Sequence, residues 1–261
     1  MRYDTGPDAV SWAPSPAPGM RQGEFCDGVR ALFTARPGGK SSGRFATLNL
    51  SHSVRDDPAA VEANREILLS ALGDGPRTLA WMRQVHGAAV VYASPSAPPG
   101  QSQEADAMFT QSPDLALAVN VADCAPVLLA DPHARLVGAA HAGRPGMAAG
   151  VVPALVAAMT DAGAEPARMH ALVGPSICGR CYEVPAWMRD EVASAVPGSA
   201  CVTRKGTPGI DLRAGLHAQL ASAGISAIAD DMRCTAESDE LYSYRRDGDT
   251  GRFAGVIWLT G

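Results

Sequence analysis

The stretch DLALAVNVADCAPVLLADPHARLVGAAHAG, residues 114–143, decides the fold of this chain. It holds three apolar runs in succession, separated by short polar turns. Two of the runs lack the apolar–polar alternation of a strand with one solvated face, which predicts strands covered on both faces. We therefore expect residues 114–143 to form the buried centre of a layered fold.

Helix and strand patterns alternate on both sides of this centre. We expect strands at 28–35, 167–175, 225–230 and 253–260, and a hairpin of 78–85 with 88–93. Helices are predicted from Asp57-Pro58 to Gly73, over 147–163 with Pro153 at its start or at a kink, over 184–196, and over 211–224 between Asp211 and Gly224.

One domain accounts for most of the chain. Residues 1–20 carry four prolines and no periodicity, which predicts a flexible tail, and 94–103 is expected to be a loop. Residues 21–261 show neither an internal repeat nor another low-complexity linker. We expect a single catalytic domain of the α/β (α+β) class over 21–261.

Charge and hydropathy exclude several classes of protein. With 22 basic and 27 acidic residues the net charge is −5, which argues against a general nucleic-acid binder. No run approaches the ~18 apolar residues of a membrane span, and the N-terminus lacks the apolar stretch of a signal peptide. The expected location is the cytoplasm, where the six cysteines should be thiols.

Two histidines and one cysteine are candidates for a metal site. His86 and His141 each end an expected strand beside small residues, and Cys124 lies at the junction of two strand candidates. A Cys-His₂ set suits zinc with one open coordination position. The alternatives are two structural histidines with a buried cysteine, or Cys124 as a nucleophile activated by a histidine.

Cys178 and Cys181 form a C-x-x-C motif. Such a motif can carry thiol redox chemistry or a second metal. A four-cysteine zinc site would need scattered partners, because the chain has no second C-x-x-C. A packed loop near the site is the favoured interpretation.

Several motifs together resemble the laccase-domain family, whose members have been called multicopper polyphenol oxidases and purine nucleoside phosphorylases. The motifs are FTARPGG (33–39), LNL (48–50), QVHG (84–87), ADA (105–107), ADCAPVLLAD (122–131), AHAG (140–143), GPSICGRCYEV (174–184) and SYRRDGDTGRFAG (243–255). They cover residues 28–261 in the family's order.

The resemblance implies a metal site at His86, Cys124 and His141, with zinc as the usual metal and copper in some members. It implies mixed β-sheets layered between helices, an α-β-β-α sandwich. The implied activity is phosphate-dependent cleavage of adenosine, inosine, guanosine and 5′-methylthioadenosine, with adenosine deamination as a second reaction. Purine nucleosides and phosphate are then the partners, and the oligomeric state, monomer or homodimer, is open.

The chain departs from the family pattern twice. It reads HAGRPG (141–146) where many relatives read HAGWRG, which displaces Arg144. Many relatives carry a histidine where Ser53 stands, and His52 is one position off. Pocket shape and substrate preference depend on both places.

Other candidates lie inside or beside the family motifs. Asp123 is a candidate to orient a ligand or move a proton, with a strand-end cap as the alternative. Phosphate suits the fork of an arginine. The candidates for binding phosphate or substrate are Arg36, Asn49, Gln84, Arg245 and Arg246.

Three functions from different classes follow. The first is a zinc-dependent purine nucleoside phosphorylase. The second is a laccase-like copper oxidase, against which the six histidines without a His-x-His pair argue. The third is a non-catalytic protein that binds a metal or a partner.

Overall fold

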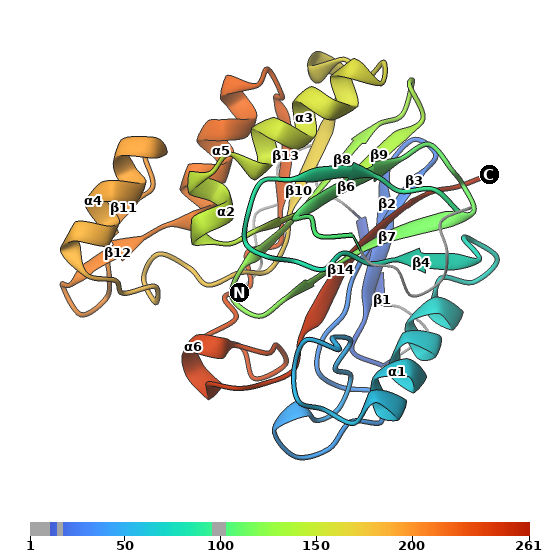
Figure 1. Ribbon diagram of the computed structural model, residues 1–261, viewed down its shortest axis with the longest axis horizontal. Helices are drawn as coiled ribbons and strands as arrows, with labels where there is room; N and C mark the ends of the chain where they lie inside the picture. Colours follow the sequence, from blue (N-terminus) through green and yellow to red (C-terminus); the bar gives the residue numbers. More distant parts are fainter. Residues whose placement is uncertain (1–10, 15–17, 96–102) are drawn as a thin grey trace.

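Two six-stranded β-sheets form the centre of the computed structural model, which describes residues 11–14, 18–95 and 103–261 (Figure 1). The first sheet contains, in spatial order, β1 (Ser11–Pro14), β2 (Arg21–Cys26), β3 (Val29–Phe33), β14 (Phe253–Leu259), β7 (Leu115–Val121) and β4 (Thr78–Ala80). The second contains β13 (Ala227–Asp230), β10 (His170–Val173), β8 (Ala125–Asp131), β9 (Leu136–Ala142), β6 (Ala107–Thr110) and β5 (Val90–Tyr92).

Helices cover the outer face of each sheet (Figure 1). The first sheet packs on α1 (Pro58–Ala71), and the second on α2 (Arg144–Ala148), α3 (Val151–Asp161) and α5 (Leu212–Ser222). The remaining elements are α4 (Ala186–Ala195), α6 (Tyr244–Asp247), the 3₁₀ turns Gly43–Phe45 and Pro166–Arg168, and a small sheet of β11 (Ala200–Val202) and β12 (Pro208–Ile210). The result is the expected mixed α/β domain with sheets between helical layers.

The three central strands lie where the apolar runs predict them. Every residue of β8 and β9 is buried, as expected for strands covered on both faces. Neighbouring side chains of a strand point to opposite faces. Leu128 accordingly packs between the two sheets, and Leu129 packs under the helices.

The predicted hairpin of 78–85 with 88–93 is wrong. β4 pairs with β7 in the first sheet, and β5 pairs with β6 in the second. The chain crosses from one sheet to the other between β4 and β5, so the turn at His86-Gly87 does not join two partner strands.

Two further boundaries differ from the sequence-based expectation. Within the predicted tail 1–20, β1 pairs antiparallel with β2, while residues 1–10 and 15–17 lie outside the described part. The predicted helix 147–163 is two helices, because Gly150 adopts a left-handed conformation (φ 80°) between α2 and α3. Of the predicted loop 94–103, residues 96–102 are not among those described.

Capping residues fix the helix starts that the sequence predicts. The Asp57 carboxylate accepts the backbone N–H of Ala59 at the start of α1, and the Asp211 carboxylate accepts that of Ala214 in α5. Such caps satisfy backbone donors that the helix leaves unpaired. Among the described residues, no helix has the length and apolar character needed to cross a membrane.

Candidate active site

The candidate site lies where the chain crosses between the two sheets. His86 lies in the crossing from β4 to β5, and Cys124 lies in the short crossing from β7 to β8. His141 projects from the end of β9. These three segments are distant in sequence, and the crossings between the two sheets bring them to one place.

The buried carboxylate of Asp106 holds the backbone around His86. It accepts the N–H groups of Val85 (3.2 Å), His86 (2.9 Å) and Gly87 (2.6 Å). These bonds stabilise His86 in the left-handed region at φ 62°, which is unfavourable for a residue with a side chain.

The same carboxylate orients His141. Asp106 Oδ1 lies 2.8 Å from His141 Nδ1, which leaves Nε2 of that ring for a ligand. A metal-binding imidazole commonly donates its other ring N–H to a carboxylate in this way. Burial alone would raise the pKa of Asp106, but the hydrogen bonds from His141, Gly87 and Val85 hold it below the ordinary value.

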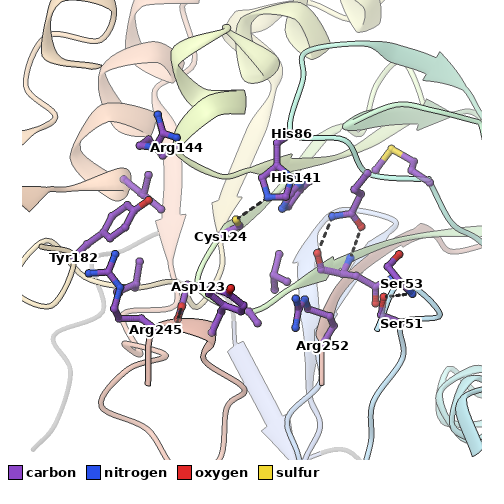
Figure 2. A pocket seen from close by; sticks show the side chains of 18 residues that line it. Ser51, Ser53, His86, Asp123, Cys124, His141, Arg144, Tyr182, Arg245 and Arg252 are labelled. Atoms are coloured by element: carbon purple, nitrogen blue, oxygen red, sulfur yellow. Dashed lines mark hydrogen bonds between the residues drawn. The ribbon is translucent and has the colours of Figure 1, made fainter. Parts of the chain in front are cut away.

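The structure brings the three candidate ligands together. One ligand atom from each of His86, Cys124 and His141 lies within 4.8 Å of the others, and Cys124 Sγ is 3.9 Å from His86 Nε2 (Figure 2). Burial would raise the pKa of the Cys124 thiol, but the imidazoles of His141 and His86 lower it. The thiolate form, which binds metals, is thereby favoured.

These residues face a cavity of about 460 Å³ that also contains three arginines, Arg144, Arg245 and Arg252 (Figure 2). Arg245 donates to the backbone oxygen of Glu183 (2.7 Å), and its guanidinium lies 5.0 Å from the ring centre of Tyr182. Tyr182 and Arg144 both line the cavity. Three cations on one cavity suit an anionic ligand.

Arg252 keeps donors for such a ligand. Its side-chain hydrogen bonds within the described part of the chain all come from Nη1, to the backbone oxygens of Thr250 and Gly251. Burial lowers the pKa of its guanidinium, and the negative groups of Cys124 and Asp123 oppose that shift. Nε and Nη2 have no partner among the described residues.

Asp123 lines the cavity, but loop contacts occupy its carboxylate. Oδ1 accepts the hydroxyls of Thr235 (2.6 Å) and Ser243 (2.7 Å), and Oδ2 accepts the backbone N–H of Arg245 (2.6 Å). Asp123 itself adopts φ 88°. Its carboxylate therefore ties together loops that carry the cavity wall.

Gln84 lines the cavity, and its amide is paired with the backbone N–H and oxygen of Asn120. Asn49 does not line the cavity: its Oδ1 accepts the backbone N–H of Arg252, so it positions that segment.

Two of the predicted phosphate-binding arginines also lie away from the cavity lining. Arg36 stacks at 5.0 Å on Tyr242 and pairs with Asp247. Arg246 uses its donors on Asp247 and on the backbone oxygens of Thr235, Ser238 and Leu241.

Sequence reasoning missed several residues of the site, namely Asp106, Asn120, Tyr182 and Arg252. Each lies inside or next to a motif, but nothing in the chain order marks Asn120, Tyr182 and Arg252 as facing the cavity, or Asp106 as the carboxylate behind the two histidines. Asn120 lines the cavity, and its Oδ1 is a buried acceptor without a partner among the described residues.

Both departures from the family pattern lie at the cavity. Arg144 and Ser53 line it, whereas His52 pairs with Glu62 on the exposed side, with 2.5 Å between His52 Nε2 and Glu62 Oε1. The displaced arginine thus remains a residue of the site, and a small hydroxyl stands at position 53.

Known proteins are similar to this chain in sequence and in fold. A purine nucleoside phosphorylase of Streptomyces coelicolor is 51% identical over 240 residues, which cover 91% of this chain and 98% of that protein. One of Corynebacterium glutamicum is 47% identical over 232 residues, 88% of this chain and 94% of that one. The crystal structure of YlmD from Geobacillus stearothermophilus superposes with a TM-score of 0.88 at 30% identity, covering 98% and 100% of the two chains.

Residues 30–260 match the family described as multi-copper polyphenol oxidoreductase laccase. This range includes every motif quoted above and both sheets apart from β1, β2 and the first residue of β3. The chain belongs to this laccase-like family.

Proposed function

We propose that this protein is a zinc-dependent purine nucleoside phosphorylase acting on adenosine, inosine, guanosine and 5′-methylthioadenosine, with adenosine deamination as a side reaction. One observation carries the proposal: the Cys-His₂ cluster and three arginines face the same cavity. The names of the Streptomyces and Corynebacterium relatives support it.

The donor set of His86, Cys124 and His141 fits zinc. A neutral imidazole and a thiolate are preferred zinc ligands, and the hydrogen bond that His141 Nδ1 donates to Asp106 leaves Nε2 of the ring free for the metal. Three protein ligands beside a cavity leave one coordination position for substrate or water. When bound there, zinc supplies a Lewis acid that activates an oxygen nucleophile.

The arginines are the proposed phosphate site. Cleavage of an N-glycosidic bond passes through a positively charged sugar, with negative charge on the leaving base. Arg252 and Arg245 would hold phosphate oxygens near the sugar, and Arg144 with Tyr182 would form the adjoining wall. Asp123, whose oxygens are occupied, would act as a positioning residue.

The test is an assay of the metal-loaded protein with adenosine and phosphate. We expect adenine and ribose-1-phosphate, and no product with Cys124→Ala. Hydrolysis to free ribose, or undiminished product from Cys124→Ala, would contradict the proposal. Arg55→Ala is the matched control, because that side chain is 91% exposed and does not line the cavity.

A laccase-like copper oxidase is the alternative, since copper can occupy the same donors. Among the described residues, one candidate metal cluster contains histidine, and it has two. Oxygen uptake with a phenol and copper-loaded protein, without phosphorolysis, would favour this alternative. Metal binding without either activity would favour a non-catalytic role.

The proposal includes a cytoplasmic location. All six cysteines are free, which suits a reducing compartment.

A further inference from the structure

A second cluster of metal-binding side chains lies outside the catalytic cavity. One ligand atom from each of Cys178, Cys181, Cys234 and Glu237 lies within 4.8 Å of all the others. None of the four lines the cavity. Cys234 is buried, Cys178 and Cys181 are half-buried, and Glu237 is exposed, so the cluster is open to solvent on its carboxylate side.

The four residues stand on two matched turns. Cys178-Gly-Arg-Cys181 closes with the N–H of Cys181 donating to Cys178 O (2.9 Å), and Cys234-Thr-Ala-Glu237 closes with that of Glu237 donating to Cys234 O (3.1 Å). A parallel bridge between Ser176 and Cys234 holds the turns together. Paired ligands with two residues between them, on facing turns, are typical of structural zinc sites.

Groups around the cluster stabilise negative charge on its ligands. The backbone N–H group of Cys178 donates to the sulfur of Cys234 (3.3 Å). Arg204 Nη2 lies 2.9 Å from Cys181 Sγ, and the same guanidinium forms an ion pair with Glu237. Donors that touch the thiolates and the carboxylate in this way offset the excess negative charge of three thiolates and a carboxylate.

We propose that Cys178, Cys181, Cys234 and Glu237 bind a structural zinc ion, separate from the ion proposed in the catalytic cavity. Sulfur ligands at about 2.3 Å in a tetrahedron lie about 3.8 Å apart, so the present arrangement needs shifts of about 1 Å or less. Four protein ligands close the coordination shell, which leaves no position for substrate.

The ion would join two loops of the cavity wall. Ile177 and Tyr182, on either side of the first turn, line the cavity. Thr235, next to Cys234, donates to Asp123, which also lines it. A zinc ion between the turns would fix these wall residues relative to each other without taking part in the reaction.

The experiment uses the full chain with Cys124→Ala, which removes the thiolate of the catalytic cluster and leaves the second cluster intact. After dialysis we expect one tightly bound zinc per chain by elemental analysis. Anaerobic titration of the apoprotein with Co²⁺ should give a thiolate-to-cobalt charge-transfer band that saturates at one equivalent. Adding Cys178→Ser and Cys234→Ser should abolish both the zinc and the band, and adding Cys26→Ser should change neither.

Two results would overturn the proposal. One is a Cys124→Ala protein that is folded by circular dichroism but holds no zinc and gives no band. The other is a disulfide among Cys178, Cys181 and Cys234 in protein purified without reductant under zinc-replete conditions. The zinc and cobalt measurements on the Cys124→Ala protein leave all four residues of the cluster unaltered. They therefore test the proposal even if the serine variants fail to fold.

Discussion

At the scale of single residues, one carboxylate organises the candidate metal cluster. Asp106 is fully buried, holds the backbone at His86 and bonds the ring of His141. Both carboxylate oxygens of Asp106 accept hydrogen bonds, and asparagine presents only one acceptor oxygen, so it cannot replace both sets of bonds. The residue lies in the ADA motif, which marks it only after the fold is known.

We predict that Asp106→Asn weakens zinc binding about 10- to 100-fold, because His141 loses its carboxylate partner. Competition with a chromogenic chelator measures the affinity. Glu104→Gln, a nearby substitution at an exposed carboxylate paired with Arg83, is the control and should leave the affinity unchanged. Unaltered zinc affinity in Asp106→Asn would contradict the assignment of Asp106 as the carboxylate that orients His141.

Arg252 should act on phosphate rather than on the nucleoside. Loss of a charge-assisted hydrogen bond costs about 1.5–3 kcal/mol, so Arg252→Ala should raise the KM for phosphate about 10- to 150-fold. The KM for adenosine should change much less, and Arg55→Ala should alter neither. Steady-state kinetics with each substrate varied in turn makes the distinction, and an increase confined to adenosine would reverse the assignment.

At the scale of elements, the site depends on close approach of β9, α2 and the two crossings. A Cβ on Gly143, between β9 and α2, would lie 2.6 Å from Cys124 Sγ and 3.2 Å from His86 Cδ2. The backbone φ of Gly143 is −79°, so space and not conformation requires glycine there.

Gly143→Ala should therefore displace the Cys124 thiolate and lower metal content, while the fold persists. We expect zinc affinity to fall about tenfold or more, as for a displaced ligand. Elemental analysis and circular dichroism test this together. A variant with full zinc content and normal activity would show that the cluster tolerates the added methyl.

The elements also show which parts of the fold the sequence could predict. β7, β8, β9, α1 and α5 carry strong local patterns or caps and lie where expected. The hairpin at 78–93 could not be excluded from sequence, because two short strands do not reveal whether they pair with each other or with distant strands. Pairing with β7 and β6 depends on contacts formed only in the folded chain.

The candidate site divides in the same way. His86, Cys124 and His141 stand out by residue type beside small neighbours, and the fold brings them together. Arginines in turn-rich segments cannot be told apart from sequence. Arg252 and Arg144 line the cavity in the folded chain. Arg36 instead stacks on an aromatic ring, and Arg246 donates to backbone oxygens of a loop and to a carboxylate. Cys234 carried no motif because its partners are distant in the chain.

At the scale of the whole molecule, the two sheets share one core. Leu128 of the second sheet packs with Phe33 and Ile257 of the first in a single buried cluster. Helices complete the sandwich on both outer faces. A chain built around a shared core should unfold as one unit.

Leu128→Ala should lower the free energy of unfolding by about 2–5 kcal/mol, as expected for a fully buried leucine. Urea unfolding followed by fluorescence and by circular dichroism should give coincident transitions for both proteins, with the midpoint lower in the variant. Two separated transitions would show that the sheets belong to independent units.

The central claim is that a metal ion held by His86, Cys124 and His141 faces a phosphate held by the cavity arginines. Anomalous diffraction at the zinc edge, from crystals soaked with phosphate and a nucleoside, tests it most directly. We predict an anomalous peak bounded by these three side chains, with phosphate density at Arg252 and Arg245. Absence of a peak there in zinc-replete crystals, or phosphate bound only elsewhere, would contradict the account.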